Sequence, residues 1–284
     1  MSIKRIHVNK IEIWTQTYGD QKNEAVILIA GAMAPATFWE EEFCRALADN
    51  DFFVIRFDNR DFGYSTHFEE SEVPPYTIND MVEDTKNILD FYEATKAHII
   101  GHSLGGSVAQ LFAVMYPERT VSLIPISSPI IAKGNLEFVN TDQKILNDLW
   151  NVLMSNRMYQ DVERGKSEFL RIHKYLNGSY DVDIEMSYNY TSRIYETEVI
   201  KPHLNHTNIQ NNVPDIFNEL KKIEVPIMFL YGDKDYLASN IQNVKILDAH
   251  LPNSNLVVLE GAGHMFFNRS LWNSISKVVL DFIL

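Results

Sequence analysis

Residues 101–106 read Gly101-His102-Ser103-Leu104-Gly105-Gly106, and this hexapeptide lies between an apolar run ending at Ile100 and a helical pattern over 108–115. A strand, a sharp turn and a helix in this order are the context that a G-x-S-x-G elbow requires. The flanking glycines have no Cβ to clash where the turn lifts the serine into the open. The start of the following helix favours negative charge beside that serine. The hexapeptide therefore predicts a nucleophile, Ser103.

A parallel sheet is predicted by the order of apolar runs along the chain. Runs rich in Val, Ile and Phe lie at 25–30, 52–57, 98–100, 121–126, 225–230 and 256–259. Such near-continuous runs are typical of strands buried on both faces, so we expect an α/β fold with a mostly parallel central sheet flanked by helices. The opening segment, 4–18, alternates in polarity and predicts an antiparallel hairpin at one edge.

Helical periodicity fills the gaps between these runs. Apolar side chains recur at three-and-four spacing over 78–92, and Thr77 with Asp80 stands where a capping pair begins a helix. The helix after the elbow is expected to end before Pro117, and a terminal helix is expected to begin near Ser270.

The composition of the chain changes between residues 133 and 213. This block is polar, rich in Asn, Tyr, Met and His, and shows helical periodicity without strand patterns. Apolar runs on both sides of it are needed for one sheet. We therefore expect a core formed by 1–132 and 214–284, with 133–213 inserted as a helical lid.

An acidic, cysteine-poor composition limits the partners of this 284-residue chain. Its formal charge of −13 opposes binding to phosphate backbones and anionic lipids, so we expect neither nucleic acid nor membrane partners. The first residues lack the apolar core of a secretory signal, and we expect a cytoplasmic protein.

Cys44 is the only cysteine, so an internal disulfide is excluded. The helical spacing of its apolar neighbours predicts a buried thiol. The sequence does not indicate an oligomeric state.

A serine hydroxyl is a weak nucleophile and needs a base, and His264 is the histidine best placed to supply one. It ends the glycine-rich loop Gly261-Ala262-Gly263-His264, directly after the last apolar run. A carboxylate must hold such a base in one tautomer, and Asp233 and Asp235 both follow the run at 225–230. We prefer Asp235 because two further residues carry it beyond the strand tip, whereas Asp233 is suited to fixing its own turn.

The oxyanion of an acyl-transfer intermediate requires two N–H donors that are in place before the reaction starts. Leu104, the residue after the serine, supplies one backbone N–H. The second is expected from the loop after the first parallel strand, where Ala32 is the first choice and Met33 the alternative.

These motifs together resemble the α/β-hydrolase superfamily. The resemblance rests on Ala30-Gly31-Ala32 with Trp39, Asp58-Asn59-Arg60-Asp61-Phe62-Gly63-Tyr64-Ser65, the elbow, Gly232-Asp233-Lys234-Asp235 and Gly261-Ala262-Gly263-His264. It covers nearly the whole chain outside the lid and implies the α/β-hydrolase fold, in which Ser, Asp and His follow in that order. Many members have His-Gly where this chain has Ala30-Gly31, and Arg-Gly where it has Arg60-Asp61. The Arg-Asp form is similar to the branch containing aclacinomycin methylesterase, which implies ester cleavage.

Asp58 and Arg60 lie two residues apart in the second of these motifs. We expect them to form a buried structural ion pair rather than to act directly in catalysis.

Hydrolysis of a carboxylic ester through an acyl-enzyme is the leading expectation, and it requires no metal or other cofactor. The resemblance implies an Asp nucleophile in dehalogenases and epoxide hydrolases, so Ser103 disfavours both. Thioester, lactone, amide and carbon–carbon bond hydrolysis and cofactor-free peroxidase activity stay open. A noncatalytic ligand-binding module is the alternative from another class.

The lid is expected to decide which small-molecule substrate enters. Its apolar and aromatic side chains suit the walls of a mostly apolar pocket, and packing of the lid onto the core explains each of them equally well. The candidates are Trp150, Leu153, Met154, Met158, Phe169, Tyr175, Tyr188, Tyr190 and Tyr195. From these we select Trp150, Met154 and Tyr188, and we add Met33 from the core.

Overall fold

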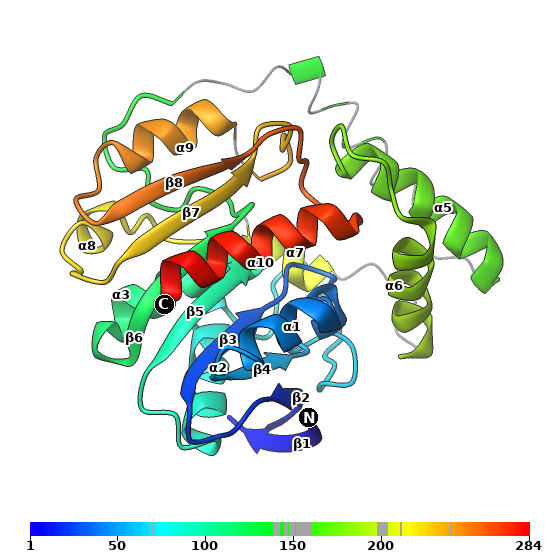
Figure 1. Ribbon diagram of the computed structural model, residues 1–284, viewed down its shortest axis with the longest axis horizontal. Coiled ribbons are helices and arrows are strands. Elements are labelled where there is room, and N and C mark those ends of the chain that lie inside the picture. The colour runs from blue at the N-terminus through cyan, green and yellow to red at the C-terminus, as the bar shows by residue number, and fades with distance from the viewer. Residues whose placement is uncertain are drawn as a thin grey trace.

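One mixed β-sheet forms the centre of the molecule (Figure 1). The computed structural model describes residues 1–69, 71–138, 143–144, 147, 151, 161–197, 204–210, 212–238 and 240–284. Within them the strand order is β1-β2-β4-β3-β5-β6-β7-β8. The strands are β1 (Ser2–Val8), β2 (Ile11–Tyr18), β3 (Glu24–Ile29), β4 (Phe52–Phe57), β5 (Ala97–His102), β6 (Thr120–Ile126), β7 (Ile227–Gly232) and β8 (Ser254–Leu259).

The pairing directions confirm the predicted sheet. β1 and β2 form an antiparallel hairpin at one edge, and β2 is also antiparallel to β4. All other neighbouring strands are parallel. In β3, Ile27 and Ile29 belong to one buried cluster, whereas Val26 and Leu28 belong to the cluster on the other face. Alternate side chains of a strand point to opposite faces, so a continuous apolar run serves both cores.

Helices cover both faces of this sheet (Figure 1). One face carries α1 (Glu41–Ala48) and α10 (Arg269–Ile283), and the other carries α2 (Ile78–Phe91), α3 (Leu104–Met115) and α9 (Ile241–Asp248). The predicted cap of α2 is confirmed, since the Thr77 N–H donates to Asp80 Oδ2 at 2.7 Å. The helix after the elbow ends at Met115, before Pro117 as predicted, because proline has no N–H to continue it.

The segment between β6 and β7 contributes helices, and its described residues add no strand to the sheet. They form α5 (Val162–Leu176), α6 (Ile184–Glu196) and α7 (Leu204–Gln210), and α8 (Phe217–Leu220) follows before β7. α5 and α6 pack on each other beside the sheet (Figure 1). The His173 ring of α5 stacks on Phe267 with centroids 3.9 Å apart, and the Tyr190 ring of α6 packs edge-on against Phe267. These contacts hold the helix pair to the loop after β8, while the lid boundaries at 133 and 213 stay a prediction.

The predicted burial of Cys44 is also confirmed. Complete burial raises the pKa of its thiol to about 12, so the side chain is protonated and packs as a small apolar group.

Among the described residues, none of the helices combines the length and the apolar character that crossing a bilayer requires.

Candidate active site

Ser103 lies at the sharp turn between β5 and α3. Its backbone has φ 52° and ψ −122°, a left-handed conformation that side chains disfavour, and its N–H donates to the Ile126 carbonyl at 3.0 Å. The turn is too tight for side chains on either side. A Cβ added to Gly105 would lie 2.2 Å from the Ile29 carbonyl oxygen, and one added to Gly101 would lie 2.1 Å from the Gly105 oxygen. The glycines of the motif are therefore required by the backbone around the serine.

His264 meets both of its predicted partners. Its Nε2 lies 3.1 Å from Ser103 Oγ, and its Nδ1 lies 3.0 Å from Asp235 Oδ2. The three residues follow β5, β7 and β8, and the carboxyl ends of these parallel strands share one edge of the sheet. An ionised Asp235 accepts the Nδ1–H, which leaves Nε2 to face the serine hydroxyl. The geometry suits proton removal from Ser103 by a neutral imidazole.

Asp235 is fully buried, and its charge is balanced by fixed donors. Its Oδ1 accepts the N–H groups of Leu237 at 3.0 Å and Ala238 at 3.1 Å. Burial acts to raise the pKa of Asp235, but the charge and hydrogen bond of His264, with the backbone donors, bring the pKa below its ordinary value. Asp233 has another role, because its Oδ1 accepts the Gly261 N–H at 2.7 Å and so ties β7 to the loop that carries His264.

The start of α3 and the loop after β3 both bring backbone N–H groups near Ser103. Leu104 is the first residue of α3, and the N–H groups of a first helical turn have no partner within the helix. A Cβ added to Gly31 would lie 3.1 Å from Ser103 Cβ, so the loop after β3 runs directly against the nucleophile. The Met33 N–H in this loop donates to His206 Nδ1 at 3.2 Å. Of the two predicted donors, Met33 is thus already hydrogen-bonded, and Ala32 stays the first candidate.

Sequence reasoning assigned no role to His102, yet the structure places its side chain against the backbone of His264. His102 is completely buried, and its Nε2 lies 2.8 Å from the His264 carbonyl oxygen. Burial lowers the pKa of His102 to about 3, so the ring is neutral and its Nε2–H donates to that carbonyl. The ring also stacks on Phe38 with centroids 4.2 Å apart. Its position in the elbow motif was visible in the sequence, but its acceptor lies 162 residues away.

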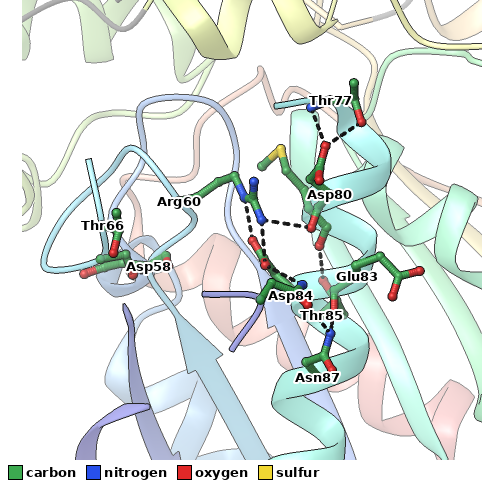
Figure 2. Close-up of polar contacts among 12 residues, drawn as sticks. Asp58, Arg60, Thr66, Thr77, Asp80, Glu83, Asp84, Thr85 and Asn87 are labelled. Carbon is green, nitrogen blue, oxygen red and sulfur yellow. Dashed lines mark hydrogen bonds and ion pairs between the residues drawn. The ribbon is translucent and has the colours of Figure 1, made fainter. Parts of the chain in front are cut away.

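The predicted ion pair between Asp58 and Arg60 is wrong. Arg60 instead pairs with Asp84 on α2, with Nε at 2.7 Å from Oδ2 and Nη2 at 2.8 Å from Oδ1 (Figure 2). Asp58 accepts the N–H groups of Ala36 at 2.7 Å and Tyr64 at 2.9 Å. The reason is geometric, because Asp84 offers both oxygens to the planar guanidinium, whereas Asp58 is engaged by the backbone.

The predicted pocket residues divide between described and undescribed parts of the chain. Met33 follows Ala32 in the loop beside Ser103, and the residue is 41% exposed. Tyr188 lies on α6. Lys166 Nζ, on α5, is 6.0 Å from the centroid of the Tyr188 ring, so this contact joins the two helices. Trp150 and Met154 lie outside the described residues.

A cavity of about 300 Å³ adjoins His264. Its walls come from the end of α5 and from the loop after β7. They are Tyr175, Leu176, Gly178, Ser179, Lys234, Tyr236, Leu237 and His264. A hollow of about 650 Å³ opens beside the amino ends of β6 and β7, at the opposite edge of the sheet, and residues 103, 235 and 264 do not line it. Of these two, the cavity beside His264 is the one that adjoins the predicted triad.

Comparison with known proteins agrees with this architecture. The family model of the α/β hydrolase fold matches residues 24–268, and the chain belongs to that family. Rhodomycin D methylesterase DauP of Streptomyces sp. (strain C5) is 34% identical over 123 residues, which are 43% of this chain and 41% of DauP. Epoxide hydrolase B of Mycobacterium tuberculosis (strain ATCC 25618 / H37Rv) is 31% identical over 40% of this chain and 32% of its own length. The chain thus matches less than half the length of these relatives.

A solved structure extends the likeness in fold to the whole chain. The esterase RhEst1 from Rhodococcus sp. ECU1013 superposes with a TM-score of 0.75, covering 100% of this chain and 98% of its own, at 18% sequence identity. At this identity the likeness shows the shared α/β-hydrolase fold.

Proposed function

We propose that this chain is a serine hydrolase that cleaves a carboxylic ester of a small, mostly apolar substrate. The observation that carries the proposal is the continuous chain of contacts from Ser103 Oγ through His264 to the buried Asp235. Two further features support it. Backbone N–H groups adjoin the serine, and a cavity adjoins the histidine.

In the proposed acylation step, Ser103 Oγ attacks the ester carbonyl carbon while His264 Nε2 takes the hydroxyl proton. The carbonyl π electrons move to oxygen, and the Leu104 and Ala32 N–H groups stabilise that oxyanion. Asp235 stabilises the imidazolium through its bond to Nδ1. His264 then gives its proton to the departing alkoxide, which leaves as the alcohol, and the acyl group stays on Ser103.

Deacylation repeats these roles with water. His264 Nε2 removes a proton from water as the water oxygen attacks the acyl carbon. The second oxyanion uses the same N–H donors, and its collapse returns the proton to Ser103 Oγ as the carboxylic acid leaves. Every proton in this cycle passes through His264, so the chain's own residues account for the reaction.

The similarity to the methylesterase DauP also supports the assignment of an ester substrate. DauP is a methylesterase, and the match to it covers 43% of this chain. The cavity beside His264 combines apolar walls from Leu176 and Leu237 with polar groups from Ser179 and Lys234. Since His264 protonates the leaving group, this cavity suits the alcohol portion of the ester.

Hydrolysis of p-nitrophenyl esters from acetate to decanoate tests the proposal. We expect turnover that depends on acyl chain length in the wild type, and its loss in Ser103→Ala and His264→Ala. Glu41→Ala, an exposed change on α1, serves as the matched control and is expected to retain activity. A folded wild type that hydrolyses none of these esters would count against the ester assignment, and tight ligand binding without turnover would favour a binding module.

A further inference from the structure

Helix α7, in the segment between β6 and β7, contacts the loop after β3. This loop carries the predicted donor Ala32 and is called the oxyanion loop below. This helix carries Asn205 and His206, and both side chains are completely buried. Buried polar side chains require hydrogen-bond partners, and Asn205 and His206 form hydrogen bonds with the core loops after β3 and β4. These bonds therefore tie the inserted segment to the backbone beside Ser103.

His206 bridges the two loops through both ring nitrogens. Nδ1 accepts the Met33 N–H at 3.2 Å, and Nε2 donates to the Arg60 carbonyl oxygen at 2.8 Å. A backbone N–H can only donate and a carbonyl can only accept, so the two bonds select the neutral tautomer with its proton on Nε2. Burial also lowers the pKa of His206, which keeps the ring neutral.

Met33 needs such a partner because its backbone is held in an unfavourable conformation. Its φ is +55°, in the left-handed region that suits glycine rather than a methionine. A residue in this region persists when the surrounding structure fixes it. The bond to His206 fixes the peptide that joins Ala32 to Met33, and thereby limits rotation of the Ala32 backbone.

Asn205 fixes the same helix at a neighbouring point. Its Nδ2 donates to Asp61 Oδ2 at 2.8 Å, and its Oδ1 accepts the Ser71 N–H at 3.1 Å. Asp61 itself has φ +66°, and the Asp61 Oδ1 accepts the Phe68 N–H at 2.5 Å. The aspartate in this glycine-like position thus provides an acceptor that a glycine would lack.

We propose that His206 is a positioning residue for the oxyanion hole: by accepting the Met33 N–H, it holds the Ala32 N–H where the oxyanion forms. The inference rests on the proposed function. It also means that the oxyanion hole is complete only when α7 is docked on the core.

Two substitutions separate the two bonds of His206. In His206→Asn, the amide oxygen takes the place of Nδ1 and still accepts from Met33, while the bond to Arg60 is lost. In His206→Gln, the longer amide reaches the Arg60 carbonyl, while the acceptor for Met33 is lost. His206→Leu removes both bonds. Asn208→Ala is the matched control, because Asn208 Nδ2 on the same helix donates to the Ser71 and Glu72 carbonyls and not to the oxyanion loop.

We would measure kcat and KM for p-nitrophenyl butyrate, the rate at which a fluorophosphonate labels Ser103, and Tm. The labelling rate is informative because negative charge develops on the phosphoryl oxygen in the oxyanion hole as Ser103 Oγ attacks phosphorus and fluoride leaves. His206→Gln and His206→Leu are expected to lower kcat and the labelling rate ~10- to 100-fold with KM nearly unchanged. His206→Asn is expected to stay within about threefold of the wild type, and Asn208→Ala to lower Tm alone.

Equal kcat values in the Asn and Gln variants would overturn the role of His206 while leaving the proposed function intact, as would a folded His206→Leu variant with wild-type kcat. A wild type that hydrolyses no ester and whose Ser103 is not labelled would remove the proposed function, and the inference with it.

Discussion

His102 Nε2 lies 2.8 Å from the carbonyl oxygen of His264. The residue that precedes Ser103 in the chain is therefore hydrogen-bonded to the backbone of His264. The bond joins the turn after β5 to the loop after β8 and couples the positions of Ser103 and the His264 imidazole. Neighbouring aromatic rings support it, since His102 also packs edge-on against Phe266. A small displacement of a catalytic group lowers the reaction rate strongly, and this hydrogen bond restrains displacement of His264.

His102→Leu is therefore expected to lower kcat about tenfold or more, with a smaller effect on KM, because the His264 carbonyl loses its buried donor. His102→Gln retains an N–H near the position of Nε2 and is expected to recover most of the activity. Steady-state kinetics on p-nitrophenyl butyrate checks this. If both variants behave alike, the hydrogen bond does not position His264.

Asp235→Asn preserves shape but replaces the charged acceptor with an amide. The His264 ring then favours the tautomer with its proton on Nε2, which cannot accept the Ser103 proton, and kcat is expected to fall by about 10⁴. Asp233→Asn is the matched control, since its amide oxygen still accepts the Gly261 N–H. We expect it to lose less than about tenfold. Comparable losses in the two variants would contradict the assignment of Asp235.

The Arg60–Asp84 pair should matter for stability. Both side chains are almost fully buried, at 5% and 3% exposure. Asp84→Ala leaves a buried guanidinium without its carboxylate and is expected to lower the free energy of unfolding by about 3–5 kcal/mol. Glu41→Ala breaks an exposed pair with Arg45 and is expected to change it by less than about 1 kcal/mol. Urea denaturation measures both, and equal effects would argue against a buried pair.

Glu40, at the start of α1, should make stability depend on pH. Burial, followed by the charge of Glu42, raises the pKa of Glu40 from 4.5 to about 7. The folded state then binds a proton more tightly than the unfolded state, so stability falls as pH rises from about 4.5 to about 7. Relative to Glu40→Gln, the wild type is expected to lose up to roughly 3 kcal/mol across this window. Urea denaturation at pH 4.5 and pH 8 tests it, and parallel losses in the two proteins would contradict the prediction.

The sheet could be predicted because each buried parallel strand appears in the sequence as a continuous run of apolar residues. The run at 52–57 coincides with β4, Phe52–Phe57, since continuous apolar residues suit a strand buried on both faces. The helix boundary at Met115 followed from Pro117, whose effect on the backbone is local. Ser103, Asp235 and His264 were predicted by similar logic, because each lies within five residues of the end of a strand and near glycines.

The partners of polar side chains were harder to predict because they depend on tertiary packing. Arg60 lies two residues from Asp58, yet its partner is Asp84 on a helix 24 residues further along. The bond between Met33 and His206 spans 173 residues and links a core loop to the inserted segment. Sequence spacing gives the candidates for such contacts, but only the packing of loops and helices selects among them.

Mass spectrometry after exposure to a fluorophosphonate tests whether Ser103 is an activated nucleophile, and it requires no knowledge of the substrate. We expect one adduct, on Ser103, that forms in the wild type, is strongly slowed in His264→Ala and is absent in Ser103→Ala. A folded wild type that stays unlabelled, or that carries the adduct on another residue, would contradict it.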